Sequence, residues 1–205
     1  GPTHEPVEQE AQIRLMEKLK NHSGRDSVRV FRPCDVHATT HCWRMAMENM
    51  ETPTALIFSR QNIKDLPSGT DYESGVRRGA YEVVHEANPD VILVASGSEV
   101  STLADTAALL ANDGIKARVV SCPSEGLFRR QPKEYQESLL PTDFPIFGLT
   151  AGLPITFEGL VGNKGKVHGL ESFGFSAPYK VLDEKLGYTA ENIYREVKDY
   201  LGGLA

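Results

Sequence analysis

The stretch NPDVILVASGSEVSTLADTAALLANDGIKARVVSCP at residues 88–123 decides the fold of this 205-residue chain. It contains an apolar run at 91–95, a glycine-containing turn, an amphipathic segment and a second β-branched run at 115–120. Apolar residues of the middle segment recur at three- and four-residue steps and so share one helical face: Val100, Leu103, Ala107 and Leu110. Two parallel strands joined by a helix require a right-handed crossover, so this stretch predicts an α/β domain.

Two residues mark the ends of the predicted helix. Ser98 is an N-cap residue by type, because its hydroxyl can accept a hydrogen bond from a free backbone N–H of the first turn. Gly114 falls just beyond the last turn, where a left-handed residue is commonly needed. The turn 96–99 also resembles an anion cradle, but Glu99 already places negative charge there, which favours the capping interpretation.

Composition argues against polyanionic partners. The formal net charge is −6, and binding to nucleic acid or to anionic lipid normally needs a basic face. No run of about 18 apolar residues predicts a membrane span. Cys34, Cys42 and Cys122 lie in apolar surroundings without metal-ligand spacing, which favours buried reduced thiols over a disulfide or a metal site. Reduced thiols in turn favour a cytoplasmic location.

The chain divides into two α/β units and a connection. Residues 1–63 contain two predicted helices and two short strands, which suit part of a parallel-sheet domain. Residues 64–78 are polar, contain proline and glycine and lack a sustained period, so they are predicted to form a linker. Residues 79–205 are predicted to form a complete three-layer α/β/α domain with a mostly parallel sheet.

Local patterns give further expectations for each unit. Gly79–His85 and Ile146–Leu149 are predicted strands, 124–141 a loop and a short helix, and 159–169 a loop. Pro178 leads into a helix that Gly187 ends, and Thr189 caps the last helix. The first helix is predicted to turn Val7, Ala11, Leu15 and Leu19 inward. Asp35 is predicted to cap the second helix. The second helix is predicted to turn Val36, Thr39, Trp43, Met47 and Met50 inward.

Two side chains are candidates for ligand binding. Arg60 follows the predicted strand 54–59, at the edge where open α/β sheets bind ligands, and its guanidinium suits phosphate or carboxylate. A surface arginine or an interdomain ion pair fits the same position. His4 lies just ahead of the first predicted helix, whose free N–H groups favour anionic or hydroxyl-rich ligands, while an exposed turn histidine is the plainer interpretation.

Two other patterns are weaker as sites. His37 and His41 have a spacing that can bind metal, but no acidic or thiol partner completes a site, which favours helix-surface residues. The loop Asn163-Lys164-Gly165-Lys166 could contact a phosphate, and a solvated loop is the simpler interpretation.

Several short motifs follow one another along the chain. They are Gly-Pro-Thr-His-Glu-Pro-Val-Glu at 1–8, Phe-Arg-Pro-Cys-Asp at 31–35, Pro-Thr-Ala-Leu-Ile-Phe-Ser-Arg-Gln-Asn at 53–62, Ala-Ser-Gly-Ser-Glu-Val at 95–100, Lys-Ala-Arg-Val-Val-Ser at 116–121, and Ser-Phe-Gly at 172–174 before Ala177-Pro178. Together and in this order, they resemble transketolase over nearly the whole chain. The chain departs from the family where Glu5 replaces a glutamine and where Thr150 replaces a glutamate that many members have. Residues 18–27 are also longer than the usual connection.

The resemblance implies what the complete protein does. A transketolase transfers a two-carbon ketol unit from ketose phosphates to aldose phosphates in the pentose phosphate pathway, using thiamine diphosphate and a divalent metal, Mg or Ca, as a homodimer. Residues 1–63 correspond to the rear of the pyrimidine-binding domain, and residues 79–205 to the C-terminal domain. By motif matching, His4 contacts the reacting hydroxyls and Arg60 the sugar phosphate.

The resemblance also implies what this chain lacks. The cofactor and metal ligands and the activating glutamate belong to a missing N-terminal portion, so the chain alone is expected to be inactive and to bind no cofactor. No catalytic, cofactor-binding or metal-binding residue is assigned within it. Alternatives are a related thiamine enzyme, either deoxyxylulose-phosphate synthase or a 2-oxo acid dehydrogenase β-subunit, and a non-catalytic ligand-binding or regulatory α/β module.

Overall fold

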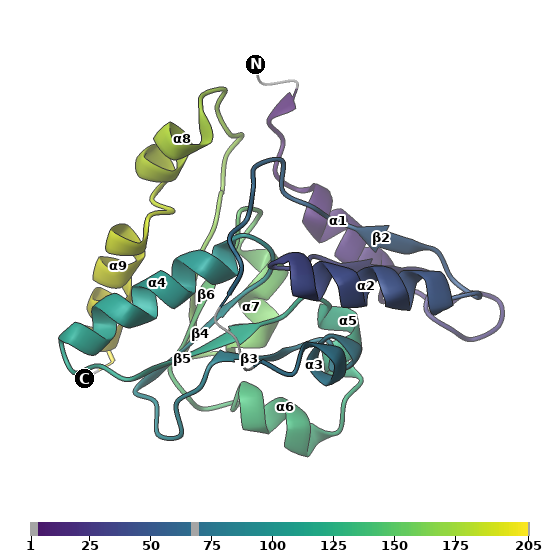
Figure 1. The fold of residues 1–205 in the computed structure, drawn as a ribbon, viewed down its shortest axis with the longest axis horizontal. Coiled ribbons are helices and arrows are strands. Elements are labelled where there is room, and N and C mark those ends of the chain that lie inside the picture. Colours follow the sequence, from purple (N-terminus) through teal and green to yellow (C-terminus); the bar gives the residue numbers. More distant parts are fainter. Residues whose placement is uncertain (1–3, 67–69, 205) are drawn as a thin grey trace.

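Two sheets form the framework of the computed structural model, which describes residues 4–66 and 70–204 (Figure 1). In this part of the chain, β1 (Arg29–Phe31) pairs in parallel with β2 (Thr54–Leu56). The second sheet has the order β3-β5-β4-β6-β7, in which β3 is antiparallel to β5 and the other pairs are parallel. Its strands are β3 (Tyr81–Val84), β4 (Val91–Ala95), β5 (Ala117–Ser121), β6 (Ile146–Leu149) and β7 (Lys166–His168).

Helices fill most of the connections between these strands. They are α1 (Gln9–Met16), α2 (Val36–Glu48), α3 (Tyr72–Arg78), α4 (Glu99–Asn112), α5 (Glu125–Arg129), α6 (Lys133–Leu139), α7 (Ile155–Val161), α8 (Tyr179–Leu186) and α9 (Ala190–Gly202). Figure 1 shows α4 and α9 side by side on one side of the larger sheet, with α5, α6 and α7 away from them.

The central strand β4 shows why the larger sheet is covered on both faces. Its residues Val91, Leu93 and Ala95 belong to one core cluster with apolar residues of α4 and α9. The alternate residues Ile92 and Val94 belong to a second cluster with residues of α5, α6 and α7. Because side chains alternate across a strand, a strand buried throughout must have a helical layer on each side. The predicted α/β class with a mostly parallel, three-layer second unit is confirmed.

The β4-α4-β5 unit forms as the sequence predicts, with one exception at its cap. The two strands pair in parallel, and Gly114 follows the helix with φ of 76°. The prediction that Ser98 caps α4 with its side chain is wrong, because the hydroxyl donates to Glu99 Oε1 at 2.9 Å instead. The Ser98 hydroxyl is therefore hydrogen-bonded to the carboxylate of Glu99 and not to a backbone N–H of the first turn.

The first unit packs directly on the second. Phe31, Cys34, Ala38 and Cys42 lie in the same core cluster as the residues of β4. Two backbone hydrogen bonds join the units at Arg32, whose N–H donates to the carbonyl of Pro123 at 2.9 Å and whose carbonyl accepts from the N–H of Gly97 at 3.0 Å. Residues after β1 therefore bury against the start of α4 and the end of β5.

The predicted inward faces of α1 and α2 are wrong. In α1 the buried residue is Arg14, while Leu15 and Leu19 are exposed. In α2 the buried residues are Ala38, Cys42 and Met45, while four of the five predicted residues are exposed: Val36, Trp43, Met47 and Met50. The prediction followed the largest apolar side chains, whereas the helices turn their smaller or charged residues toward the second unit.

The connections contain more regular structure than predicted. The predicted linker 64–78 includes α3, whose cap Asp71 accepts from Ser74 N–H, although residues 67–69 lie outside the described part. The predicted loop 159–169 contains the end of α7 and all of β7. Short segments such as these lack the length over which periodicity becomes visible.

Other local predictions are confirmed. Thr189 caps α9 by accepting from Asn192 N–H, and Gly187 ends α8 with φ of 82°. Cys34, Cys42 and Cys122 are buried free thiols. Within the described ranges, no helix has the length and apolar character to cross a membrane.

Candidate functional site

Arg60 lies beyond the carboxyl end of β2, the strand end predicted to carry it. The strand stops at Leu56, earlier than expected, and Arg60 follows in an exposed connection. Its guanidinium forms no ion pair with any described residue. An arginine without a carboxylate partner at this edge keeps its five N–H donors available for an external anion.

A cavity of about 550 Å³ adjoins Arg60. Its wall combines the connection after β2, the start of the chain, and the turn that leads into α8. The lining residues are Glu5, Arg60, Gln61, Phe175, Ser176, Ala177, Pro178, Tyr179 and Leu182. This volume is within the range of small-molecule sites, which combine an apolar wall with a few polar groups that orient the ligand.

The first described residues are tied to the turn before α8. The backbone N–H of Gly174 donates to the carbonyl of Glu5 at 2.9 Å, and the hydroxyl of Ser176 donates to Glu5 Oε1 at 2.7 Å. Figure 1 shows α8 and the lead into α1 at the same end of the molecule. The cavity wall therefore joins residues that are far apart in the sequence.

His4 is exposed and precedes Glu5, but it does not belong to the described lining of this cavity. The prediction that His4 lies just ahead of a helix terminus is wrong, because α1 begins only at Gln9. The free N–H groups of α1 thus lie several residues further along the chain. The structure brings Arg60 together with the neighbour of His4, and it leaves the imidazole at the surface.

A second, larger cavity of about 750 Å³ lies next to the first and shares Gln61, Tyr179 and Leu182 with it. It opens between the connection after β2, the first turns of α4, and α8. Lys64 lines it, but its ammonium is paired with Asp105 at 2.6 Å. Lys180 also lines the larger cavity and forms no ion pair with a described residue, so both cavities offer a cation, and the smaller one offers the guanidinium of Arg60 with its two-pronged donor geometry.

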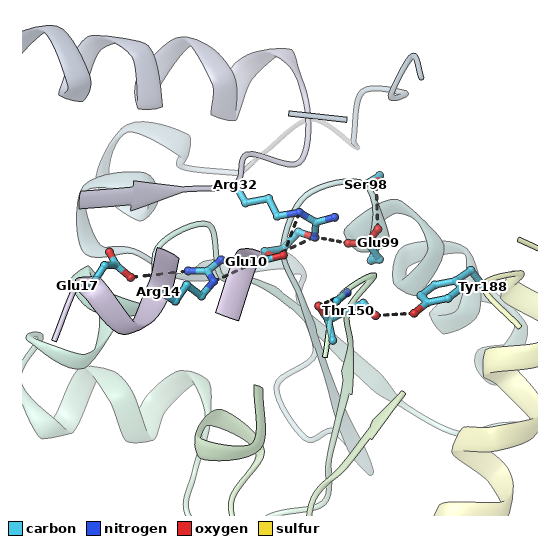
Figure 2. Close-up of polar contacts among 10 residues, drawn as sticks. Glu10, Arg14, Glu17, Arg32, Ser98, Glu99, Thr150 and Tyr188 are labelled. Atoms are coloured by element: carbon cyan, nitrogen blue, oxygen red, sulfur yellow. Dashed lines mark hydrogen bonds and ion pairs between the residues drawn. The ribbon is translucent and has the colours of Figure 1, made fainter. Parts of the chain in front are cut away.

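A network of buried ion pairs connects β1, α1 and α4, the elements that support the site (Figure 2). Arg32, which follows β1, donates to the carbonyl of Ser96 at 2.6 Å and forms an ion pair with Glu99 at the start of α4. Its Nε lies 3.6 Å from Glu10 Oε2, and Glu10 is paired with Arg14 at 2.9 Å. Two arginines and two carboxylates thus join β1, α1 and α4.

Burial and charge act in opposite directions on these groups. Burial alone would raise the pKa of Glu10, but the guanidinium groups of Arg14 and Arg32 outweigh it and hold that pKa below its usual value. The pKa of Glu17 is raised, because burial outweighs Arg14 and the N–H of Val30, which donates to it at 3.0 Å. Burial would lower the pKa of Arg32, but Glu99 and Glu10 raise it.

Thr150 is fully buried beside this network, where the family resemblance led us to expect a glutamate in many members. Its hydroxyl accepts from Gly152 N–H at 3.2 Å, and its carbonyl accepts from the hydroxyl of Tyr188 at 2.7 Å (Figure 2). The threonine therefore satisfies its polar groups locally and adds no charge near Glu99.

The weaker candidates do not form a site with these residues. His37 is exposed against the ring of Tyr72, and His41 lies on the same helix, as the surface interpretation predicts. Lys166 belongs to β7 and lies 3.7 Å from Glu196 rather than in a free loop. Among the described residues, no group of three His, Cys, Asp or Glu side chains could hold a metal ion.

Sequence reasoning missed most of the cavity wall. Glu5 lies inside a quoted motif, but only its difference from the family pattern drew attention to it. Phe175 and Tyr179 belong to a segment with no sign of ligand contact in its own pattern. A turn that closes against the start of the chain is a tertiary feature, and no local periodicity predicts it.

Two family models match this chain. One describes a transketolase-like C-terminal domain and covers residues 79–189, and the other describes the pyrimidine-binding domain of transketolase and covers residues 1–65. Among curated proteins, Transketolase 2 of Vibrio parahaemolyticus is 37% identical over 203 residues, and transketolase of Staphylococcus aureus is 40% identical over 200 residues. These alignments cover 98% and 96% of this chain and 29% of each relative.

Solved structures agree with this match. Transketolase from Leishmania mexicana superimposes with a TM-score of 0.85 at 36% identity, over 98% of this chain and 28% of that one. A split gene transketolase described as an inactive beta4 tetramer shares the fold, with a TM-score of 0.73 at 20% identity, over 98% of this chain and 64% of that one. The chain spans about 29% of the length of the curated relatives it matches. With both domain models, these relatives and this fold in agreement, the chain belongs to the transketolase family.

Proposed function

We propose that this chain is the C-terminal part of a transketolase that transfers a two-carbon ketol unit from ketose phosphates to aldose phosphates. Its own share of that activity is to bind the substrate, with Arg60 at the sugar phosphate and His4 at the hydroxyls near the reacting carbons. The observation that carries the proposal is the guanidinium of Arg60, which forms no ion pair with the described residues and lies beside a cavity of about 550 Å³ in a chain of this family.

Arg60 has the chemistry that phosphate binding requires. Its planar guanidinium can donate two parallel hydrogen bonds to one phosphate group, which fixes the orientation of the sugar as well as its affinity. Phe175 and Tyr179 line the same cavity and could contact the sugar, although both side chains are exposed in the described structure. His4 can donate or accept a hydrogen bond at a sugar hydroxyl through a neutral imidazole.

The described residues do not provide a site for the cofactor's metal, since they hold no suitable group of three ligands. We therefore propose that thiamine diphosphate and its divalent metal bind to the portion of the enzyme outside this chain, which the family resemblance places in the N-terminal part. There the cofactor would supply the electron sink that ketol transfer needs. Calorimetric titration of this chain with thiamine diphosphate and Mg²⁺ should give no saturable heat.

The same portion is proposed to complete the first unit. β1 and β2 form a sheet of only two strands in the described residues, and large apolar side chains of α2 such as Trp43 and Met47 are exposed. A sheet this small needs further strands or packing to be stable. We propose that the rest of the pyrimidine-binding domain and a second copy of the enzyme cover these surfaces, in a cytoplasmic homodimer of the pentose phosphate pathway.

The test uses the complete enzyme, assembled with the upstream portion. Arg60→Ala should lower kcat/KM for a ketose phosphate by about 10- to 150-fold, since a hydrogen bond to a charged group contributes about 1.5–3 kcal/mol. The corresponding unphosphorylated ketose should be affected far less. Arg60→Lys should recover part of the loss, because it restores the charge without the two-pronged geometry.

Two results would contradict the assignments. Equal losses for phosphorylated and unphosphorylated ketoses would remove Arg60 from the phosphate site. In the same assay, His4→Ala should lower turnover without changing thiamine diphosphate affinity, and the reverse pattern would remove His4 from the substrate hydroxyls.

A further inference from the structure

Glu5 and Arg60 line the same cavity and are the charged residues in its described wall. A phosphate held by Arg60 would therefore share the cavity with a carboxylate as well as with a cation. The other described lining residues are neutral, so no further charge of this wall offsets that repulsion. The strength with which the cavity attracts an anion therefore depends on whether the carboxylate of Glu5 stays in its wall.

The C-terminal unit holds Glu5 in place. The Ser176 hydroxyl donates to Glu5 Oε1 at 2.7 Å, and the Gly174 N–H donates to the Glu5 carbonyl at 2.9 Å. The residue is half-buried, and it is fixed at its side chain and at its backbone. A carboxylate held in this way cannot swing far from the cavity when an anion enters it.

We propose that Glu5 is a specificity-determining residue that weakens the binding of dianionic sugar phosphates at Arg60 and so narrows the difference between phosphorylated and neutral sugars. The proposal rests on the proposed role of Arg60. It also gives the C-terminal domain a part in substrate selection, since Ser176 and Gly174 position the carboxylate. Arg60 attracts the phosphate, and Glu5 sets how strongly that attraction exceeds the affinity for an uncharged sugar.

The expected size follows from Coulomb's law. A sphere with the cavity's volume of about 550 Å³ is about 10 Å across. For charges at that separation in an effective dielectric of about 40–80, one carboxylate weakens the binding of a phosphate dianion by roughly 4- to 16-fold. The same carboxylate has almost no electrostatic effect on a neutral sugar. Because mobile ions screen charges at this separation, the effect should shrink as ionic strength rises.

Glu5→Gln is the informative substitution. The glutamine is nearly the same size, its amide oxygen can still accept from Ser176, and its backbone carbonyl is unchanged, so the substitution removes the charge and keeps the ties. Glu134→Gln is the matched control. It makes the same change of charge at an exposed position of α6, outside the cavity wall.

The experiment titrates the complete enzyme, assembled with the upstream portion, with ribose 5-phosphate and with ribose, and follows binding by calorimetry at low and at high salt. Glu5→Gln should tighten ribose 5-phosphate by roughly 4- to 16-fold at low salt and by clearly less at high salt. Ribose binding should be unchanged in Glu5→Gln, and ribose 5-phosphate binding should be unchanged in Glu134→Gln.

The outcomes separate this inference from the proposed function. If Arg60→Ala abolishes ribose 5-phosphate binding while Glu5→Gln leaves it unchanged at low salt, the role of Glu5 is refuted and that of Arg60 stands. An equal gain for ribose and its phosphate would show a change of shape and also refute the role of the charge. If Arg60→Ala has no effect, or if no protein binds saturably, the phosphate site itself is wrong and both proposals fail.

Discussion

Removing the Arg32 side chain should destabilise the contact between the two units more than any exposed arginine does. Arg32 donates to the Ser96 carbonyl and is paired with Glu99 and Glu10, and its side chain is only 11% exposed. Arg32→Ala would leave Glu99, 8% exposed, without its cation. The substitution therefore strands buried negative charge in addition to removing contacts.

The magnitude follows from the burial of both partners. Removing one member of a buried ion pair costs about 3–5 kcal/mol, because the remaining charge stays desolvated. For a chain of this size, each kcal/mol lowers the melting temperature by about 2–4 °C, so the expected loss is roughly 6–20 °C. Part of that loss should return in the double variant Arg32→Ala/Glu99→Gln, which removes the stranded charge.

The assay is thermal and urea unfolding of the chain, followed by far-UV circular dichroism and by the fluorescence of Trp43 in α2. Arg44→Ala is the matched control, because the Arg44 side chain is 57% exposed and is paired with the exposed Glu48 and Glu73. Exposed pairs contribute about 0–1 kcal/mol, so this variant should unfold close to the parent.

A loss below about 1 kcal/mol for Arg32→Ala would refute the reasoning, since it would mean that the network is solvated and behaves like a surface pair. A double variant that is less stable than Arg32→Ala would also contradict it. In that case Glu99 would stabilise α4 through its own hydrogen bonds and would not be stranded by the loss of Arg32.

Three further predictions concern Gly79, Glu10 and Glu17. Gly79→Ala should cost at least about 2 kcal/mol more than Gly114→Ala in urea unfolding, because both have positive φ but only at Gly79 would a Cβ lie 2.4 Å from backbone atoms; equal costs would show that this backbone adapts. Glu10→Gln should lose less stability, relative to the parent, as pH falls below about 4.5, since a lowered folded-state pKa contributes stability that is lost on protonation. Glu17 has a raised pKa in the folded state, so its ionised form lowers the stability of the parent as pH rises above about 4.5. The free energy of unfolding of Glu17→Gln, relative to the parent, should therefore be higher at pH 7 than at pH 3.5. For Glu10→Gln the same comparison should give the opposite result.

The second unit could be predicted well because its elements carry complete local signals. β4 is an uninterrupted apolar run, α4 has a regular buried stripe, and Gly114 and Gly187 stand where left-handed residues end helices. Each of these signals is local, and the tertiary packing agrees with it. The strands and the helix of the central unit therefore lie within a few residues of their predicted positions.

The first unit could not be predicted to the same depth. In α2 the large apolar residues Trp43 and Met50 dominate the pattern, yet the core receives Cys42 and Ala38 from the opposite side. A helix that contacts two surfaces has apolar residues on both faces, and periodicity cannot tell which face meets the part of the fold in view. Met50 is 88% exposed in the described part of the chain, so the size of an apolar side chain was a poor guide to the buried face of α2.

The candidate site shows the same limit in its two arginines. Arg32 and Arg60 both follow parallel strands of the small sheet, so the strand-end argument applies to either position, although only Arg60 was predicted to bind a ligand. Their environments differ because of residues distant in sequence: Glu99 and the Ser96 carbonyl reach Arg32, while no carboxylate pairs with Arg60 among the described residues. The side chain of Arg32 therefore connects the two units, whereas the guanidinium of Arg60 can still bind a ligand. In both cases a residue of the C-terminal unit decides the role of the arginine. Glu99 at the start of α4 neutralises Arg32, and Ser176 in the turn before α8 holds the carboxylate of Glu5 in the cavity beside Arg60.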